Sequence, residues 1–239
     1  MKRLVIIPTY NEIENIEAMV DKVLSLEPLI SLLVIDDGSP DGTASVVKRK
    51  QIEYPDRVHL IERQGKMGLG TAYIAGFRWA LDNNFDIISE MDCDFSHNPN
   101  DLPKIMKACE DGSDVAVGSR YITGVNVVNW PIGRVIMSYY ASAYVRTVLG
   151  INVRDCTAGF VCYRAEMLRK IDLDGIEMKG YGFQIEMKYT AVKLGGKVIE
   201  IPIIFTDRTE GTSKMSGSIF GEAFWGVLKL KLRKITPAK

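Results

Sequence analysis

Short apolar runs alternate with helical patterns along the first half of the chain. The runs lie at Leu4–Ile7, Leu32–Ile35, Val58–Ile61, Ile87–Met91 and Val115–Val117. Segments such as Glu12–Leu26 and Thr71–Asn83 separate them and carry apolar residues at helical spacing. This alternation predicts βαβ units and a mostly parallel sheet covered by helices on both faces. The expected fold class is therefore α/β.

The alternation becomes less regular after about Tyr121. We predict a helix rich in Tyr, Val, Ile and Met at Val135–Leu149, a helix near Phe183–Leu194 and a strand at Val198–Phe205. The last predicted helix, Ser218–Lys234, carries one apolar stripe formed by Ile219, Phe220, Ala223, Phe224, Val227 and Leu228. Its charged residues beyond Glu222 are all basic. Such a helix suits either an anionic membrane surface or docking on the core with a solvated basic tail.

Bulk composition excludes several classes of protein. The 30 basic and 30 acidic side chains cancel, so we expect no nucleic-acid partner. The four cysteines show no CxxC spacing, which favours reduced thiols over a structural zinc site. The first apolar stretch is too short for a signal peptide, and Arg134 and Arg146 interrupt the most hydrophobic helical region. We therefore expect neither a leader nor a membrane span.

The strongest chemical signal is the sequence Met91-Asp-Cys-Asp-Phe-Ser-His97. Asp92 and Asp94 follow a hydrophobic strand at positions i and i+2, so both carboxylates can converge on one hard cation. Oxygen ligands of this kind suit Mg²⁺ or Mn²⁺. Such an ion would bridge the two phosphates of a nucleotide diphosphate and neutralise charge on the leaving group. Alternatively, the two acids only cap the turn and the helix that follows Pro99.

Two further polar clusters follow predicted strand ends, where ligands of parallel sheets bind. The segment 36–43 (DDGSPDGT) contains paired acids that could grip a ribose diol or support a metal, although Asp-Gly loops are also common turns. The segment 8–12 (PTYNE) offers an aromatic ring and a carboxylate that could contact a base. Its alternative is a helix start, with Asn11 as N-cap and Glu14 completing a capping box.

The remaining candidates are a group of cationic side chains and two carboxylates that could act as a base. Arg120, Arg134, Arg208 and Lys214 could bind phosphate oxygens, because guanidinium forks match them in bidentate fashion. Each could equally be a solvated charge or part of a structural salt bridge. Glu186 or Asp155 could deprotonate a hydroxyl acceptor.

Seven motifs in order carry a family resemblance: PTYNE (8–12), DDGSPDGT (36–43), DCD (92–94), GSRY (118–121), DCTAGF (155–160), GYGFQIE (180–186) and DRTEGTSKM (207–215). Together they resemble family-2, GT-A-type glycosyltransferases and, within these, polyprenol (dolichol) monophosphate mannose synthases. The resemblance spans about residues 4–230. It implies a GT-A fold, a Rossmann-like sheet flanked by helices, and inverting transfer of mannose from GDP-mannose to a polyprenyl phosphate. It also implies one catalytic domain over 1–239, with a nucleotide-binding half (1–121), an acceptor half (122–215) and a basic amphipathic C-terminal helix (216–239).

The resemblance also implies roles for individual residues. The donor would contact Pro8, Tyr10, Glu12, Ile35, Asp37, Asp92, Cys93, Asp94, Arg120, Arg208 and Lys214. Mg²⁺ or Mn²⁺ would be held by Asp92, Asp94 and Ser96, although many family members carry Gln where this chain has Ser96, so that contact would run through water. The acceptor phosphate would contact Ser119, Arg120 and Arg134. Asp94, Arg134 and Arg208 are the expected catalytic residues, and an already anionic phosphate acceptor would need no base.

A lipid acceptor implies contact with a membrane. Many relatives append transmembrane helices, which this chain lacks, so we expect a cytoplasmic protein bound peripherally to the cytoplasmic membrane face. Val127–Leu149 and the C-terminal helix would provide this contact, or a separate membrane-anchored partner would. The aromatic residues Trp130, Tyr139, Tyr140 and Tyr144 suit the interface, but could instead fill the core or a dimer contact.

Three other functions stay open. One is transfer from UDP-glucose to a polyprenyl phosphate, and another is transfer to a saccharide hydroxyl, which would require Glu186 or Asp155 as base. The third is a non-catalytic nucleotide-binding module whose acids only cap turns.

Overall fold

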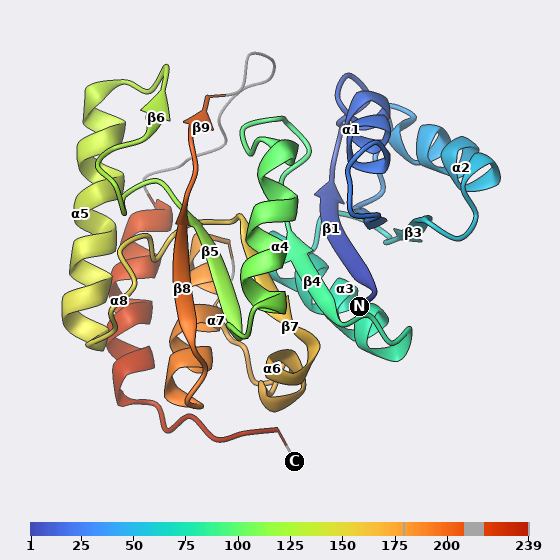
Figure 1. The fold of residues 1–239 in the computed structure, drawn as a ribbon. Helices are drawn as coiled ribbons and strands as arrows, with labels where there is room; N and C mark the ends of the chain where they lie inside the picture. The colour runs from blue at the N-terminus through green and yellow to red at the C-terminus, as the bar shows by residue number, and fades with distance from the viewer. Residues whose placement is uncertain (179, 208–217, 239) are drawn as a thin grey trace.

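A seven-stranded, mostly parallel sheet forms the centre of the molecule (Figure 1). The computed structural model describes residues 1–178, 180–207 and 218–238, without the side chains at 181 and 218–223. The sheet order is β3-β2-β1-β4-β7-β5-β8, and β7 alone among these strands runs antiparallel to its neighbours. The strands are β1 (Arg3–Thr9), β2 (Ser31–Asp36), β3 (Val58–Glu62), β4 (Ile87–Glu90), β5 (Val115–Ser119), β7 (Val161–Arg164) and β8 (Val198–Pro202). The predicted α/β class is confirmed.

Helices cover both faces of this sheet. They are α1 (Ile16–Leu24), α2 (Thr43–Glu53), α3 (Leu69–Asp82), α4 (Leu102–Glu110), α5 (Ile132–Leu149), α6 (Ala165–Lys170), α7 (Tyr181–Lys193) and α8 (Ser218–Leu232), with a 3-10 turn, η1, at Pro99–Asp101. Strand side chains alternate between the faces. Leu4 and Ile6 pack with α3, α6 and α7, whereas Val5 and Ile7 pack with α1, α2 and α4. The near-continuous apolar strands predicted this two-sided burial.

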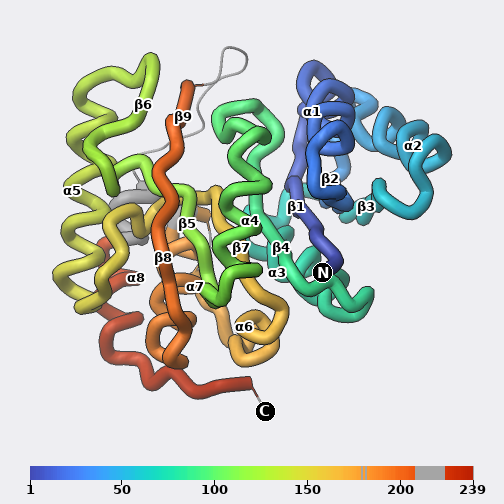
Figure 2. The backbone as a smooth tube through the Cα atoms, viewed as in Figure 1, coloured from blue at the N-terminus to red at the C-terminus, as the bar shows by residue number. Residues whose placement is uncertain are grey.

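A third apolar cluster joins α5, α7 and α8. Val145 of α5, Ile185 of α7 and Val227 and Leu230 of α8 are buried together. Figures 1 and 2 show α5 and α8 side by side at one end of the molecule. Of the predicted stripe, Val227 is buried, Leu228 is half-buried and Phe224 is exposed, whereas the buried Leu230 was not part of it. The side chains of Ile219, Phe220 and Ala223 lie outside the described ones. No helix in the described part of the chain is long and apolar enough to cross a bilayer.

Two of the predicted elements differ from the structure. The strand predicted at Val198–Phe205 is split: after Ile203 the chain changes partner, and β9 (Phe205–Thr206) pairs with β6 (Val127–Val128). The alternative helix start at Asn11 is wrong. Asn11 has a left-handed φ of 58°, and α1 begins at Ile16, whose amide donates to the Glu12 carbonyl. The division of the chain near residue 121 stays a prediction.

Candidate active site

The carboxyl ends of β1, β2 and β4 meet at one edge of the sheet, as expected for parallel strands. The Thr9 hydroxyl donates to Asp36 Oδ1 at 2.9 Å, and the Asp37 amide donates to the Thr9 carbonyl at 3.0 Å. The Met91 amide, directly before the acidic pair, donates to the Ile6 carbonyl at 3.1 Å. The polar segments after these strands therefore share one edge.

At the β1–β2 side of this edge, two cations that the sequence did not single out join the predicted nucleotide residues. Arg63 Nε lies 2.6 Å from Asp37 Oδ1, and its Nη1 donates to Thr71 Oγ1 at 2.8 Å. Lys66 Nζ lies 5.1 Å from the Tyr10 ring centroid. Both cations follow the end of β3, and that position was the available sequence signal.

The loop that carries the acidic pair is held by short-range contacts. Asp94 Oδ1 accepts a hydrogen bond from the Ser96 amide at 3.1 Å, so Asp94 does cap its own turn. The following 3-10 turn is capped by Asn98, whose Oδ1 accepts from the Asn100 amide at 3.1 Å. The alternative in which the acids cap this helix is therefore wrong.

His97 closes the same loop and was not predicted as a functional residue. Its Nδ1 accepts a hydrogen bond from the Asp92 amide at 3.2 Å, and its ring stacks on Phe160 with centroids 5.0 Å apart. Burial lowers the pKa of His97 to about 4. The neutral ring that results is the form that can accept this hydrogen bond.

The oxygen atoms of this loop fit a hard divalent cation. Asp92 and Asp94 both line a cavity, and the buried Ser96 hydroxyl has no hydrogen-bond partner within the described residues. The described residues contain no cluster of three or more His, Cys, Asp or Glu side chains that could hold an ion. Mg²⁺ and Mn²⁺ sites of nucleotide enzymes commonly use one or two carboxylates and leave the other positions to water and substrate phosphates. The donor set fits that pattern.

The cavity has a volume of about 440 Å³, within the range of small-molecule sites. Its wall contains five of the predicted site residues, namely Asp92, Asp94, Ser96, Arg120 and Arg134. The other described candidates, Pro8, Tyr10, Glu12, Ile35, Asp37, Cys93 and Ser119, are not part of this wall. Arg208 and Lys214 lie outside the described residues. Apolar residues of α5, α7 and α8 complete the wall: Met137, Ala141, Tyr144, Val145, Ile185, Phe224 and Val227.

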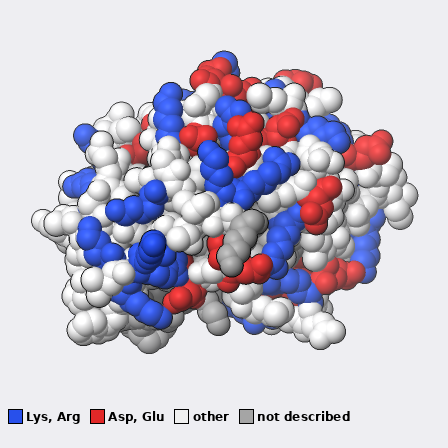
Figure 3. All heavy atoms as spheres, turned by 90° about the horizontal axis from the view of Figure 1, so that it is seen from below, with Lys and Arg blue, Asp and Glu red and all other residues white. Residues whose placement is uncertain are grey.

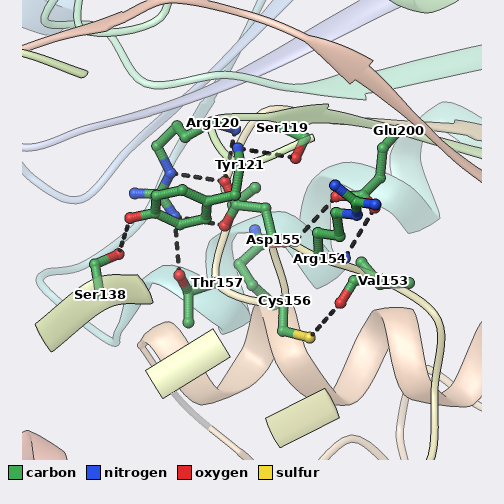
Figure 4. Close-up of polar contacts among 12 residues, drawn as sticks. Ser119, Arg120, Tyr121, Ser138, Val153, Arg154, Asp155, Cys156, Thr157 and Glu200 are labelled. Atoms are coloured by element: carbon green, nitrogen blue, oxygen red, sulfur yellow. Dashed lines mark hydrogen bonds and ion pairs between the residues drawn. The ribbon is translucent and has the colours of Figure 1, made fainter. Parts of the chain in front are cut away.

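Arg120 is held in this wall by Asp155 (Figure 4). Its Nε lies 2.7 Å from Asp155 Oδ2, and its Nη2 lies 2.6 Å from Oδ1 and 2.9 Å from the Thr157 hydroxyl. Burial alone would raise the pKa of Asp155, but the Arg120 charge, the hydrogen bonds from Arg120 and the Lys188 charge together lower that pKa. The Ser119 hydroxyl is buried and accepts from the Tyr121 amide at 3.3 Å. Arg120 is therefore fixed in position by a buried carboxylate.

Arg134 lies close to Arg120 because both pack against Trp130. The guanidinium carbons of Arg134 and Arg120 lie 4.0 and 5.4 Å from the centroid of the Trp130 ring. Arg134 Nη1 contacts both oxygens of Asp207 at 2.9 Å, a partner that the sequence did not identify although Asp207 precedes Arg208 in its motif. Trp130 Nε1 and Arg134 Nε are buried without partners among the described residues. Trp130 and Arg134 both line the cavity, so their hydrogen-bond donors make this part of it suited to an anion.

Glu186, one of the two carboxylates considered as a base, does not line the cavity. Its side chain is buried and accepts from the amides of Glu177 and Met178 and from Arg233. This carboxylate therefore joins the end of α8 to α7.

A buried polar network lies beneath the cavity and was missed from the sequence. Gln184 Nε2 donates to Glu90 Oε2 at 2.6 Å, and Lys188 Nζ donates to the carbonyls of Ala158 at 2.7 Å and Cys156 at 3.3 Å. Burial raises the pKa of Glu90 to about 8 and lowers that of Lys188 to about 8. The signal was Glu90 itself, an acid in an apolar strand, since buried carboxylates need partners.

Comparison with known proteins places this geometry in a family. The model named Glycosyl transferase family 2 matches residues 4–172. Over 232 residues the chain is 46% identical to polyprenol monophosphomannose synthase of Mycolicibacterium smegmatis, covering 97% of this chain and 88% of the relative. Over 229 residues it is 47% identical to undecaprenyl-phosphate mannosyltransferase of Micrococcus luteus, covering 96% and 93%.

The fold has solved counterparts. Glucosyl-3-phosphoglycerate synthase of Mycobacterium tuberculosis, in complex with Mn²⁺, UDP and phosphoglyceric acid, superposes with a TM-score of 0.70 at 19% identity. The match covers 97% of this chain and 78% of that one, and at this identity it shows a shared GT-A fold alone. The sequence matches go further, and the chain belongs to glycosyl transferase family 2 and is a glycosyltransferase.

Proposed function

We propose that the chain transfers mannose from GDP-mannose to a polyprenyl phosphate, with inversion, giving polyprenyl-phosphate β-mannose and GDP. One observation carries this proposal. A single cavity combines the paired acids Asp92 and Asp94, the cations Arg120 and Arg134, and an apolar wall from α5, α7 and α8. A sugar diphosphate, an anionic acceptor head and a lipid chain each match one part of that wall. The names of the two sequence relatives support mannose as the transferred sugar and a polyprenyl phosphate as the acceptor.

On the donor side, Tyr10, Glu12 and Asp37 would hold the nucleoside, with Pro8, Ile35 and Cys93 shaping its site. Asp92, Asp94 and Ser96 would hold Mg²⁺ or Mn²⁺ at the diphosphate. When bound, the metal would offset the negative charge that develops on the departing GDP. Arg208 and Lys214 are proposed to contact the donor diphosphate as well.

On the acceptor side, Arg120 and Arg134 would bind the phosphate, with Ser119 nearby. Asp155 keeps the Arg120 guanidinium in place, and Trp130 keeps the two arginines close to each other. Two positioned cations offset the repulsion between an anionic acceptor and an anionic donor. The phosphate oxygen could then attack the anomeric carbon opposite the leaving GDP.

The surroundings of the two candidate bases favour a phosphate acceptor over a saccharide hydroxyl. Asp155 is engaged by Arg120, and Glu186 is engaged by two backbone amides and Arg233. Although burial opposes it, the contacts with Arg120 lower the pKa of Asp155 and make it a poor base, and Glu186 does not line the cavity. A phosphate monoester needs no such base, since it is anionic near neutral pH.

We further propose that the protein acts at the cytoplasmic face of a membrane, through α5 and α8. Tyr140 and Trp225 expose 67% and 70% of their surface, and Ile132 and Ile136 add apolar area on α5. Lys and Arg side chains gather on the adjoining face, toward the side of α5 and α8 (Figure 3). This combination suits an anionic bilayer surface, directly or beside a membrane-anchored partner.

The test is transfer of radiolabelled mannose from GDP-mannose to a short-chain polyprenyl phosphate, with and without Mg²⁺ or Mn²⁺. A UDP-glucose reaction runs beside it. We expect a metal-dependent lipid product from GDP-mannose alone. Lipid product from UDP-glucose alone would overturn GDP-mannose as the proposed donor. Absence of lipid product from both donors would overturn polyprenyl phosphate as the proposed acceptor.

A further inference from the structure

Two buried tyrosines, Tyr73 and Tyr163, have hydroxyls that find no hydrogen-bond partner among the described residues. Tyr73 of α3 and Tyr163 of β7 are both fully buried, and within the described residues neither hydroxyl has a partner. A buried hydroxyl that has lost its water without gaining a partner is unfavourable for folding. Such a group calls for an explanation, for example a ligand that supplies the missing partner.

The surroundings of the two hydroxyls differ. Tyr73 belongs to the cavity wall, beside Leu69 and Gln184, whereas Tyr163 does not. After burial, the groups that most raise the pKa of Tyr73 are Asp92 and Glu90, followed by Tyr163 and Asp94. Tyr73 therefore keeps its proton, and it lies near the acids proposed to hold the diphosphate.

The position of the Tyr73 ring is fixed by its neighbours. It stacks on Phe183 of α7 with centroids 6.0 Å apart and planes 10° apart, and on Phe77 at 6.3 Å. The start of α3 lies close to α7 because residue 70 is glycine: a Cβ there would lie 2.8 Å from the Phe183 ring. The hydroxyl therefore cannot swing away to find another protein partner.

The chemistry of the wall indicates which part of a ligand meets Tyr73. Arg120 and Arg134 supply fixed positive charge, which suits phosphate oxygens. Tyr73 and Gln184 are uncharged polar groups, and such groups suit the hydroxyls of a sugar. A nucleotide sugar whose diphosphate lies at Asp92 and Asp94 would carry its hexose next to this uncharged part of the wall.

We propose that Tyr73 is a specificity-determining residue whose hydroxyl donates a hydrogen bond to one hydroxyl of the transferred hexose. This inference rests on the proposed nucleotide-sugar transfer. It explains why a hydroxyl is kept at a site where phenylalanine would fold at least as well. A site built to pair a substrate hydroxyl also rejects analogues that lack it.

The experiment compares Tyr73→Phe with Tyr163→Phe in the full chain. Each variant loses one unpartnered buried hydroxyl, so thermal unfolding should occur at an equal or higher temperature than in the wild type. We expect Tyr73→Phe to lower kcat/KM for the nucleotide sugar about 3- to 10-fold, the range for one lost hydrogen bond, and to leave GDP binding unchanged. Tyr163→Phe should retain wild-type kinetics.

Monodeoxy analogues of the donor sugar sharpen the result. For the analogue that lacks the paired hydroxyl, Tyr73→Phe and wild type should have equal kcat/KM, whereas the other analogues keep the difference. No effect of Tyr73→Phe on any donor would overturn the assignment, as would an equal loss with every analogue. A wild type that transfers sugar from neither GDP-mannose nor UDP-glucose would instead overturn the proposed function and this assignment with it.

Discussion

The Asp155 carboxylate binds both the backbone amide and the guanidinium group of Arg120. Asp155 Oδ2 accepts from the Arg120 amide at 2.9 Å and from Nε at 2.7 Å, and Oδ1 accepts from Nη2 at 2.6 Å. The carboxylate is fully buried, and Arg120 is nearly so. The pair therefore sets both the fold of the 155–160 loop and the position of a cation in the cavity.

The first prediction follows from this burial. Asp155→Asn should lower the free energy of unfolding by about 3–5 kcal/mol, because it leaves a buried guanidinium without its counter-charge. Urea denaturation measures the change. The matched control is Glu166→Gln, which removes the acid of the exposed Arg164–Glu166 pair and should cost about 0–1 kcal/mol. Equal effects of the two substitutions would contradict the structural role of Asp155.

The second prediction concerns pH. The pKa of Asp155 lies below its usual value of 3.8 in the folded chain, so the unfolded chain takes up this proton first as pH falls. The stabilisation by Asp155 is therefore complete above pH 3.8 and is lost as pH falls through the folded pKa. Unfolding curves of wild type and Asp155→Asn should converge on acidification below pH 3.8. A constant difference over that range would contradict this assignment.

Local sequence patterns were sufficient to predict the strands around which the sheet is built, because each is an apolar run bounded by polar segments. They did not predict β7, a four-residue strand that inserts between β4 and β5 in the opposite direction. Insertion between two strands that are close in sequence depends on long-range packing, which periodicity over a short window does not contain.

The same limit applies to the site. Asp92, Asp94, Arg120 and Arg134 stand out as residue types in motifs, and all four line the cavity. Gln184 does not stand out, because its partner Glu90 lies 94 residues away in sequence. The Asp207 partner of Arg134 is likewise 73 residues distant. Pairs of this kind become recognisable once the chain is folded.

The third prediction tests the metal ligands. Asp94→Asn should weaken Mn²⁺-dependent GDP binding on the order of 10-fold or more, because a neutral amide is a poorer ligand for a hard cation. Calorimetric titration with and without Mn²⁺ gives the result. Asp111→Asn, which removes the acid of an exposed pair with Lys107, is the control and should bind GDP like wild type. Intact metal-dependent binding in Asp94→Asn would reject Asp94 as a ligand.

The fourth prediction tests Arg134, the proposed acceptor cation on α5. Arg134→Lys keeps the charge but loses the planar fork and the Nε donor at the cavity, so kcat/KM for polyprenyl phosphate should fall about 10-fold or more. GDP-mannose binding should stay within about twofold of wild type, a difference of under 1 kcal/mol. Arg146→Lys, on the same helix but outside the cavity wall, is the control. If the substitution weakened only GDP-mannose binding, Arg134 would be assigned to the donor and not to the acceptor phosphate.

The fifth prediction concerns the apolar surface of α5 and α8. Tyr140→Ser and Trp225→Ser should each weaken binding to vesicles of anionic lipid about 3- to 10-fold, since each removes a large exposed side chain that would enter the bilayer interface. Ile52→Ser is the control. Ile52 is 83% exposed on α2, which lies at the other end of the sheet from α8 in Figure 1. Vesicle sedimentation measures binding, and sedimentation velocity without lipid measures self-association.

The two measurements separate a membrane surface from a dimer contact. If the exposed aromatic residues face lipid, both substitutions weaken vesicle binding while the sedimentation coefficient of the lipid-free protein stays constant. If they pair two copies of the chain, the substitutions lower the sedimentation coefficient and leave vesicle binding unchanged. The second outcome would remove α5 and α8 as the membrane contact. An anchored partner would then have to bring the cavity to its lipid acceptor.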